Sequence, residues 1–301
     1  MQFIQQLING LTIGAFYSLV ALGYTMVYGV LKLINFSHGD LFMWGAYLGL
    51  TGLNVLLALL PQAGAWAILP VVIIVMITVA LAGVLVERVA YRPLRTAGRL
   101  APVISALGVA FILESLARNV YGASWKTYPT GITPTGRIAL GGDVRVGVMQ
   151  VVVLVISFLI MGALYLFVQR TRTGTAMRAV SLDHDISRLM GIDVDRIIAI
   201  VFVIGPGLGG VAGMIVALYY GSFDFTLGWV FGLKAFIAAI MGGIGNIPGA
   251  MLGGMLLGII ETLGAGYISP QWKDVIAYVI LIIILIFRPT GLLGEQVAEK
   301  L

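Results

Sequence analysis

Two stretches of polar residues and glycines interrupt the apolar segments of this chain, and they hold the side chains most able to do chemistry. The first spans residues 35–40 and the second spans residues 242–249. A polar group is costly in apolar surroundings, so it usually faces protein or a water-filled cavity. Both stretches are therefore candidates for a passage or a gate. The candidate residues are Asn35, Phe36, Ser37, His38, Asp40, Gly242, Gly243, Gly245 and Asn246.

Residues 35–40 allow two interpretations. In the first, they form a turn in which Asn35 and Ser37 cap the next helix. In the second, they form a break between helices that lines or gates a pathway, as irregular backbone at membrane depth often does. His38 is the one side chain of this stretch that titrates near neutral pH. A single histidine is weak support for a proton relay or a metal, and we expect no metal site.

Residues 242–249 also allow two interpretations. Pro248 has no backbone N–H, so a regular helix cannot run through this stretch. The stretch is then either a tight turn between two helices or a segment that shapes a pore.

Lys234 is a charged residue inside an apolar segment. It could extend to the surface or pair within the protein, with Glu114 or Glu261 as its partner. A structural ion pair is the favoured interpretation, and the sequence does not choose between the two glutamates.

Several kinds of chemistry are not expected. The chain has no cysteine, which excludes disulfides, thiolate metal sites and cysteine nucleophiles. It lacks the Gly-x-x-x-x-Gly-Lys-Ser/Thr loop that binds ATP. Neither a pair of catalytic carboxylates nor a nucleophile–base motif stands out, so we expect no catalytic residues.

One glycine motif could mislead. Residues 205–210 fit the G-x-G-x-x-G dinucleotide fingerprint, but that fingerprint needs a preceding strand, and this copy lies in an apolar segment. Its glycines instead recur every four residues, which is the small-x-x-x-small pattern of helix contacts in membranes. The predicted helix-packing residues are Gly205, Gly209, Gly213, Gly249 and Gly253.

The composition fixes the class of protein. Of 301 residues, 60% are hydrophobic and 10% are charged, whereas an ordinary soluble domain is about 25% charged. A water-soluble fold of this length has too little volume to bury so much apolar surface. We therefore predict an all-α polytopic membrane protein, with residues 1–301 forming a single transmembrane domain.

Segments of ~20 apolar residues can span a bilayer, and the chain has about nine of them, with eight to ten as the range. The expected spans are 7–31, 40–60, 65–86, 101–118, 148–168, 197–218, 228–245, 247–267 and 273–288. The net charge of +5 is explained by basic cytoplasmic loops rather than by nucleic acid. Arginines gather in residues 87–100 and 169–196. This distribution predicts an external N-terminus, a cytoplasmic C-terminus and an external loop at 119–147.

The 169–196 loop has the pattern of one short amphipathic helix. Thr173 or Thr175 could cap its start, and Gly191 is placed to end it. Asp185 and Arg188 are spaced to pair. The helix either rests on lipid headgroups or docks onto a cytoplasmic partner. Its expected apolar stripe consists of Ala179, Leu182, Ile186 and Leu189.

This loop resembles the coupling loop of permease subunits in ATP-binding-cassette importers, and most closely that of branched-chain amino acid permeases. The resemblance lies in Thr173-Gly-Thr-Ala-Met-Arg-Ala179, Asp183 and Gly191-Ile-Asp193. The resemblance extends to the blocks at residues 10–47, 232–254 and 288–294, which occur in the same order as in the family. Within the family, the chain most resembles the first of the two paired permease subunits. At Asn246 the family more often carries serine.

The resemblance implies a fold with probable inverted repeats and a defined set of partners. These are a second homologous permease, two ATPase subunits that bind the ATP, and an extracytoplasmic amino-acid-binding protein, all at a bacterial inner membrane. The chain would bind no cofactor and hydrolyse nothing. The implied coupling residues are Thr173, Gly174, Arg178, Ala179, Asp183, Asp185 and Gly191.

The implied cargo is leucine, isoleucine, valine or a related hydrophobic amino acid. A passage with few fixed charges suits such a solute, but it suits other neutral solutes equally. The alternatives are a permease for urea or short amides and, from another class, a secondary transporter or channel that works without an ATPase.

Overall fold

The computed structural model describes residues 2–95, 97–98, 100–141 and 144–294. Its dominant elements are long apolar helices, because a backbone in lipid must satisfy its hydrogen bonds internally. The long helices are α1 Gln2–Leu31, α2 His38–Leu59, α3 Ile68–Val86, α4 Leu100–Tyr121, α5 Val148–Arg170, α8 Val194–Tyr220, α9 Leu227–Gly242, α10 Ile247–Tyr267 and α11 Lys273–Phe287.

Shorter elements connect these helices. They are α6 Arg172–Leu182, α7 His184–Leu189, η1 Pro61–Ala67, the π-helical turn η2 Glu87–Tyr91, η3 Arg92–Leu94 and η4 Pro270–Trp272. Strands β2 Arg137–Gly141 and β3 Val144–Gly147 form an antiparallel hairpin. Strand β1 Lys126–Thr127 pairs in antiparallel fashion with β4 Ser222–Phe223.

Eight helical segments of the described chain are long and apolar enough to cross a membrane, within the predicted range. The exception among the nine predicted spans is 228–245, where α9 has 16 residues. Gly243, with φ +107°, ends this helix, since few residues other than glycine adopt that backbone conformation. Helix α9 is therefore shorter than a typical span.

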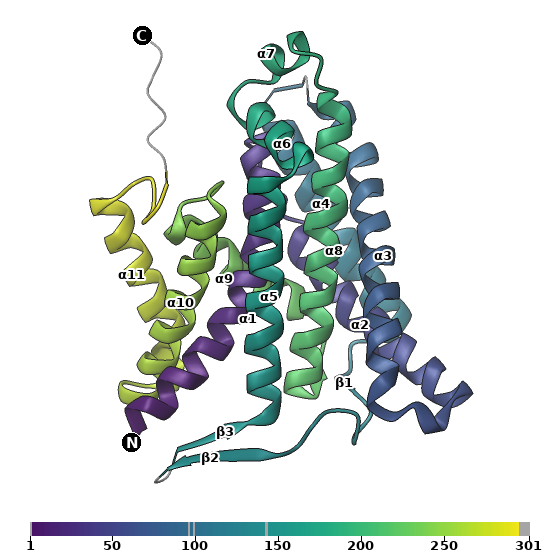
Figure 1. Ribbon diagram of the computed structural model, residues 1–301, viewed down its shortest axis with the longest axis vertical. Coiled ribbons are helices and arrows are strands. Elements are labelled where there is room, and N and C mark those ends of the chain that lie inside the picture. The colour runs from purple at the N-terminus through teal and green to yellow at the C-terminus, as the bar shows by residue number, and fades with distance from the viewer. Residues whose placement is uncertain (1, 96, 99, 142–143, 295–301) are drawn as a thin grey trace.

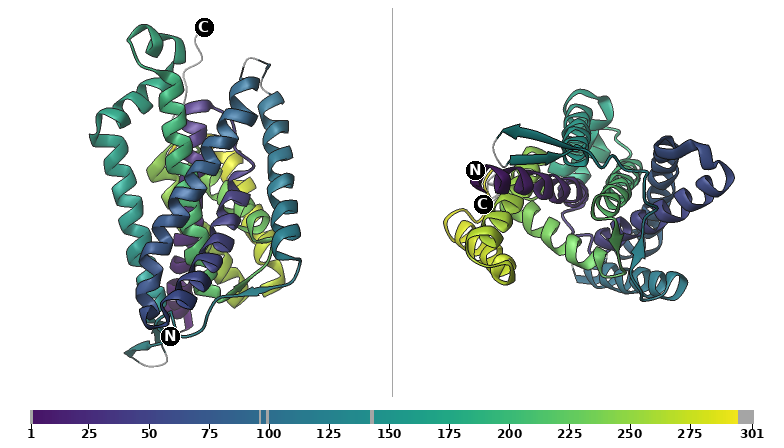
Figure 2. Two further views of the ribbon diagram at one scale, coloured as in Figure 1. Left: turned by 90° about the vertical axis from the view of Figure 1, so that its right-hand side faces the viewer. Right: turned by 90° about the horizontal axis from the view of Figure 1, so that it is seen from below.

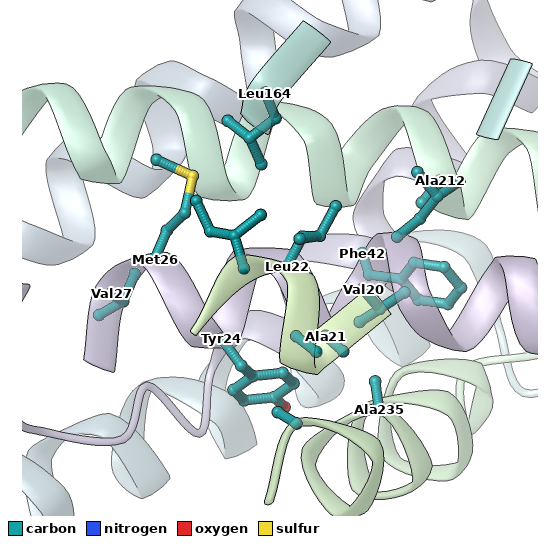
Figure 3. Packing of buried hydrophobic residues seen from close by; sticks show 14 of the residues in the cluster. Val20, Ala21, Leu22, Tyr24, Met26, Val27, Phe42, Leu164, Ala212 and Ala235 are labelled. Carbon is teal, nitrogen blue, oxygen red and sulfur yellow. The ribbon is translucent and has the colours of Figure 1, made fainter. Parts of the chain in front are cut away.

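Helices α1 and α8 form the centre of the bundle, and the other long helices surround them (Figures 1 and 2). The central contacts are close because glycines lie at them and leave room for the backbone of the neighbouring helix. A Cβ on Gly213 of α8 would overlap the backbone carbonyl of Phe42 in α2, and a Cβ on Gly14 of α1 would lie 2.7 Å from the Cα of Met255 in α10. Figure 3 shows the core where side chains from α1, α2, α5, α8 and α9 meet.

The outer helices α3, α4, α5 and α11 expose large apolar side chains, among them Leu81, Ile104, Leu159 and Ile286. In water such a surface would be unfavourable, whereas lipid solvates it. The exposed apolar surface is thus the structural counterpart of the composition.

The two ends of the bundle differ. The start of α1 and the β2–β3 hairpin lie at one end, and α6 and α7 lie at the other (Figure 1). The segment between α4 and α5 returns to the bundle through Tyr128, whose hydroxyl donates to the carbonyl of Ala46 at 2.7 Å. Burial raises the pKa of Tyr128, so this hydroxyl stays a donor. The predicted loops 119–147 and 169–196 therefore lie at opposite ends.

Candidate functional site

The segment between α1 and α2 turns back into the protein. Helix α1 ends at Leu31, Lys32 has a left-handed φ of +54°, and α2 starts at His38. Asn35, Ser37 and His38 are fully buried. The Oγ of Ser37 donates to the Oδ1 of Asn35 at 2.6 Å. Ser37 stands at the N-cap position of α2, but in the described chain its side chain makes no cap to that helix. The predicted side-chain capping by Ser37 is therefore wrong, whereas the predicted turn is present and is buried.

Two glycines make the space that His38 occupies. Its imidazole lies where a Cβ on Gly23 of α1 would be, and 3.0 Å from the position of a Cβ on Gly209 of α8. The ring of Tyr24 contacts it edge-on at 4.8 Å. Phe36 packs against Phe236 of α9 with ring centres 6.0 Å apart. The segment between α1 and α2 thus packs against α1, α8 and α9.

Asp40 follows in the first turn of α2 and is also buried. Its Oδ1 lies 3.0 Å from where a Cβ on Gly228 would be, at the start of α9. The first candidate stretch therefore lies along α9, with Asp40 beside Gly228 at the start of the helix and Phe36 beside Phe236 farther along it.

The second candidate stretch is the turn between α9 and α10. Asn246 caps α10 by accepting a hydrogen bond from the backbone N–H of Gly249 at 2.9 Å. Its Nδ2 also donates to the carbonyl of Leu293 at 2.9 Å. The N–H of Leu293 donates to the carbonyl of Gly242 at 2.9 Å. The turn is thus fixed to the segment after α11, and Gly245 contacts Gly29 near the end of α1.

The predicted helix in loop 169–196 is two helices, because Asp183 interrupts it. The Oδ1 of Asp183 accepts hydrogen bonds from the N–H groups of Asp185 and Ile186 at 2.9 and 3.0 Å, and so starts α7. The first helix, α6, is capped by Thr171, whose Oγ1 accepts from Gly174 N–H at 3.0 Å. The predicted caps Thr173 and Thr175 are wrong, because α6 begins directly after α5 ends at Arg170.

The break at Asp183 also divides the predicted apolar stripe. Leu182 and Leu189 lie on different helices and are 85% and 87% exposed. Asp185 and Arg188 form the predicted ion pair at 3.5 Å. Gly191, with φ +82°, follows the end of α7 as predicted. The far end of the molecule therefore presents exposed leucines on a two-helix projection.

Two contacts tie this projection to the bundle, and a local cap starts the helix that follows it. Arg178 of α6 donates through Nη1 to the carbonyl of Val168 in α5. The Nε2 of His184 lies 2.7 Å from the carbonyl of Val30 near the end of α1. The side chain of Asp193 caps α8. Sequence reasoning missed His184, because no local pattern predicts a contact with a residue so far away in the chain.

Lys234 is paired inside the protein. Its Nζ lies 2.9 Å from Glu261 of α10 and 2.7 Å from Asp274 of α11. The hydroxyl of Tyr17 in α1 donates to Glu261 at 2.7 Å. Of the two partners left open by the sequence, the structure selects Glu261. Asp274 was not predicted, although a carboxylate in the first turn of a helix is a common favourable placement.

Two further candidate features have structural roles. Residues 205–210 lie inside α8, where the predicted packing glycines meet α1 and α2, as Gly249 and Gly253 meet the end of α9.

Among the residues that the structure describes, no three His, Cys, Asp or Glu side chains are grouped to hold a metal ion.

The chain matches known proteins along its whole length. Residues 6–285 match the family model described as the permease component of branched-chain amino acid transport systems. The high-affinity branched-chain amino acid transport system permease protein BraD of Pseudomonas aeruginosa is 42% identical, covering 99% of this chain and 98% of BraD. The corresponding permease LivH of Escherichia coli K12 is 39% identical, covering 100% of this chain and 98% of LivH.

A shorter match is the probable branched-chain amino acid transport permease protein LivM of Methanocaldococcus jannaschii. It is 28% identical over 54% of this chain and 51% of LivM. No solved structure matches the chain.

Proposed function

This chain belongs to the family of permease components of branched-chain amino acid transport systems, and from this we propose that it forms the membrane passage for leucine, isoleucine or valine in an ATP-driven importer. The observation that carries the proposal is the end-to-end similarity to two permeases of high-affinity branched-chain systems. The chain is a transport subunit and not an enzyme. Its apolar, sparsely charged spans suit a zwitterion with an aliphatic side chain.

We infer that the α6–α7 projection couples the passage to ATP hydrolysis on separate subunits. Its exposed Leu182 and Leu189 offer apolar side chains to a cleft on a cytoplasmic partner. A displacement of the projection would act on α5 through Arg178 and on α1 through His184. The end of α1 leads directly into the buried stretch 35–40, so the same displacement would reach the candidate gate.

The assembly we propose contains a second homologous permease, two ATPase subunits that bind the ATP, and an extracytoplasmic binding protein that delivers the amino acid. The partial similarity to a LivM permease supports the homologous second subunit, because two permeases of one family can pack with related surfaces. The proposed location is the bacterial inner membrane, with the α6–α7 projection in the cytoplasm.

Reconstitution tests the proposal. Proteoliposomes containing the chain, its second permease, the ATPases and the binding protein should accumulate radiolabelled leucine only when ATP is supplied on the ATPase side. The matched control carries an ATPase subunit that binds but does not hydrolyse ATP, and it should show no accumulation. Uptake of urea or short amides without uptake of branched-chain amino acids would overturn the substrate. Leucine uptake by the permeases alone would favour a secondary transporter or channel.

A further inference from the structure

Asp40 is a buried acidic residue inside the bundle. Its residue is 6% exposed, and it takes part in no ion pair within the described part of the chain. The side chain is directed toward the start of α9, where its Oδ1 approaches Gly228. The positive ends of the α2 and α9 helix dipoles support a negative group there, but they do not neutralise it.

A second carboxylate, Glu114, lies on α4, which packs against α2. Asp40, Trp44 and Tyr47 are spaced along one face of α2, and this face contacts α4. The Nε1 of Trp44 donates to the carbonyl of Leu113 at 3.1 Å, and the ring of Tyr47 stacks on Tyr121 with centres 4.4 Å apart. Glu114 follows Leu113 directly, and its charge interacts with Asp40. We call Asp40 and Glu114 the acidic seam.

Two cations on the neighbouring helices α4 and α9 are engaged elsewhere. Arg118, one turn beyond Glu114 on α4, places its guanidinium over the ring of Phe225 at 5.7 Å. Lys234 is held by two other carboxylates, Glu261 and Asp274. Among the described residues, Lys234 is thus paired with two carboxylates, whereas Asp40 and Glu114 take part in no ion pair.

Ionisable groups inside a membrane usually pair with a partner or mark the route of a charged solute. Two neighbouring carboxylates also disfavour each other's charge. A cation bound at the site would offset both the burial of an unpaired charge and the repulsion between the two carboxylates. The amino acid cargo carries such a cation, because its α-ammonium group has three hydrogen-bond donors of the kind found in lysine.

We propose that the acidic seam receives the α-ammonium group of the amino acid during its passage. The inference rests on the proposed function, since it requires a zwitterionic cargo. Ammonium–carboxylate hydrogen bonds are charge-assisted and strong, and the positive helix ends beside Asp40 favour its charged form when the ammonium group is bound. The site thereby favours amino acids over neutral amides or aliphatic acids without an ammonium group.

The test uses Asp40→Asn and Glu114→Gln in the complete reconstituted transporter. Each change removes a charge while keeping the shape of the side chain. We expect Asp40→Asn to lower the maximal rate of leucine uptake about tenfold or more, as expected for loss of a hydrogen bond to a charged group. Glu114→Gln should cause a smaller loss in the same direction. The leucine concentration for half-maximal uptake should stay unchanged, because the binding protein sets it.

Two further readouts separate cargo binding from a structural role. ATP hydrolysis stimulated by the loaded binding protein should continue in both variants, and their unfolding temperatures should match the unaltered protein. Glu261→Gln is the matched control, because it alters a carboxylate that already has a cation, and it should lower the unfolding temperature.

Leucine uptake by both seam variants at the unaltered rate would overturn the inference while leaving the proposed function intact. A drop in unfolding temperature like that of Glu261→Gln, with uptake per folded transporter unchanged, would also overturn it. If Asp40→Asn does not fold, Glu114→Gln decides alone, because this residue lies on the peripheral helix α4. Absence of leucine uptake by the unaltered transporter would instead contradict the proposed function.

Discussion

Lys234 shows how a single charge can be kept inside a membrane protein. It lies in α9, is 8% exposed, and joins α9 to α10 through Glu261 and to α11 through Asp274. Removing one member of a buried pair leaves an uncompensated charge, whereas the intact pair contributes modestly. The ion-pair network therefore affects stability mainly because the loss of one member would leave a buried charge unpaired.

This argument gives a prediction for Lys234→Met. The variant leaves Glu261 buried without its cation, and we expect it to lower the free energy of unfolding by about 3 kcal/mol. Thermal unfolding of the detergent-solubilised complex measures the loss. Asp274→Asn is the control and should cost less, because Asp274 is half-exposed and Lys234 retains Glu261. Equal unfolding temperatures for both variants and the unaltered protein would contradict the prediction.

At this scale, the sequence was informative about residue type and poor at choosing partners. It predicted that Lys234 pairs within the protein, because a charge in an apolar segment needs compensation. It could not choose Glu261 over Glu114 or find Asp274, since the partners come from separate helices whose packing no local pattern encodes. His184 was missed for the same reason, as its contact with Val30 joins distant parts of the chain.

At the scale of the elements, α6 is fixed to α5 by a short connection. Arg178 donates to the carbonyl of Val168, in the last turn of α5, where the helix dipole favours a positive charge. Gly174 packs so closely on this turn that any Cβ would overlap the carbonyl of Phe167 or Val168. A displacement of α6 should therefore move the end of α5 with it.

We predict that Arg178→Glu uncouples ATP hydrolysis from transport. The substituted glutamate loses the hydrogen bond and places a negative charge at the negative end of α5, so α6 should detach. ATPase activity should persist while leucine uptake per ATP hydrolysed falls about tenfold, as for a lost charge-assisted contact. Arg188→Gln provides the comparison, because it removes only an exposed ion pair on α7 and should leave the ratio unchanged. Intact coupling in Arg178→Glu would argue against the proposed role of α6.

The close crossing of α2 and α8 makes a second prediction at this scale. Gly213→Ala would place a methyl group on the carbonyl of Phe42, and overpacking of this kind costs about 1–3 kcal/mol. We expect a lower yield of folded protein and a lower unfolding temperature. Gly162→Ala is a matched change in α5, where a Cβ would meet no atom within 4 Å, and it should be neutral or slightly stabilising. Similar stability of the two variants would refute the role of close packing.

Element boundaries could be predicted only where the local signal was strong. The long apolar runs gave the spans, and Gly191 correctly marked the end of the loop helices. The length of α9 was overestimated, because hydropathy continues past Gly242 while the backbone turns at Gly243. Three threonines near the start of α6 are all good caps, and the end of α5 decides that Thr171 takes this position.

At the scale of the whole molecule, the sequence predicted the class, the range of spans and the separation of the two long loops. These properties follow from composition and from charge distribution, which need no knowledge of packing. The helices that surround α1 and α8 could not be predicted, because glycine spacing shows that helices touch without showing which ones. The sidedness of the molecule in the membrane is a prediction that rests on arginine distribution.

The absence of cysteine from the chain makes this sidedness directly measurable. Ser124 lies in the exposed segment between α4 and α5, and Leu182 is exposed on the projection at the opposite end. We predict that a membrane-impermeant maleimide added to spheroplasts labels Ser124→Cys and not Leu182→Cys, and that lysis makes Leu182→Cys reactive. The unaltered chain is the control and should not react. The arginines of residues 169–196 favour the cytoplasm because basic loops are retained there, so the reverse labelling would place the proposed ATPase contact on the wrong side and contradict the coupling mechanism as a whole.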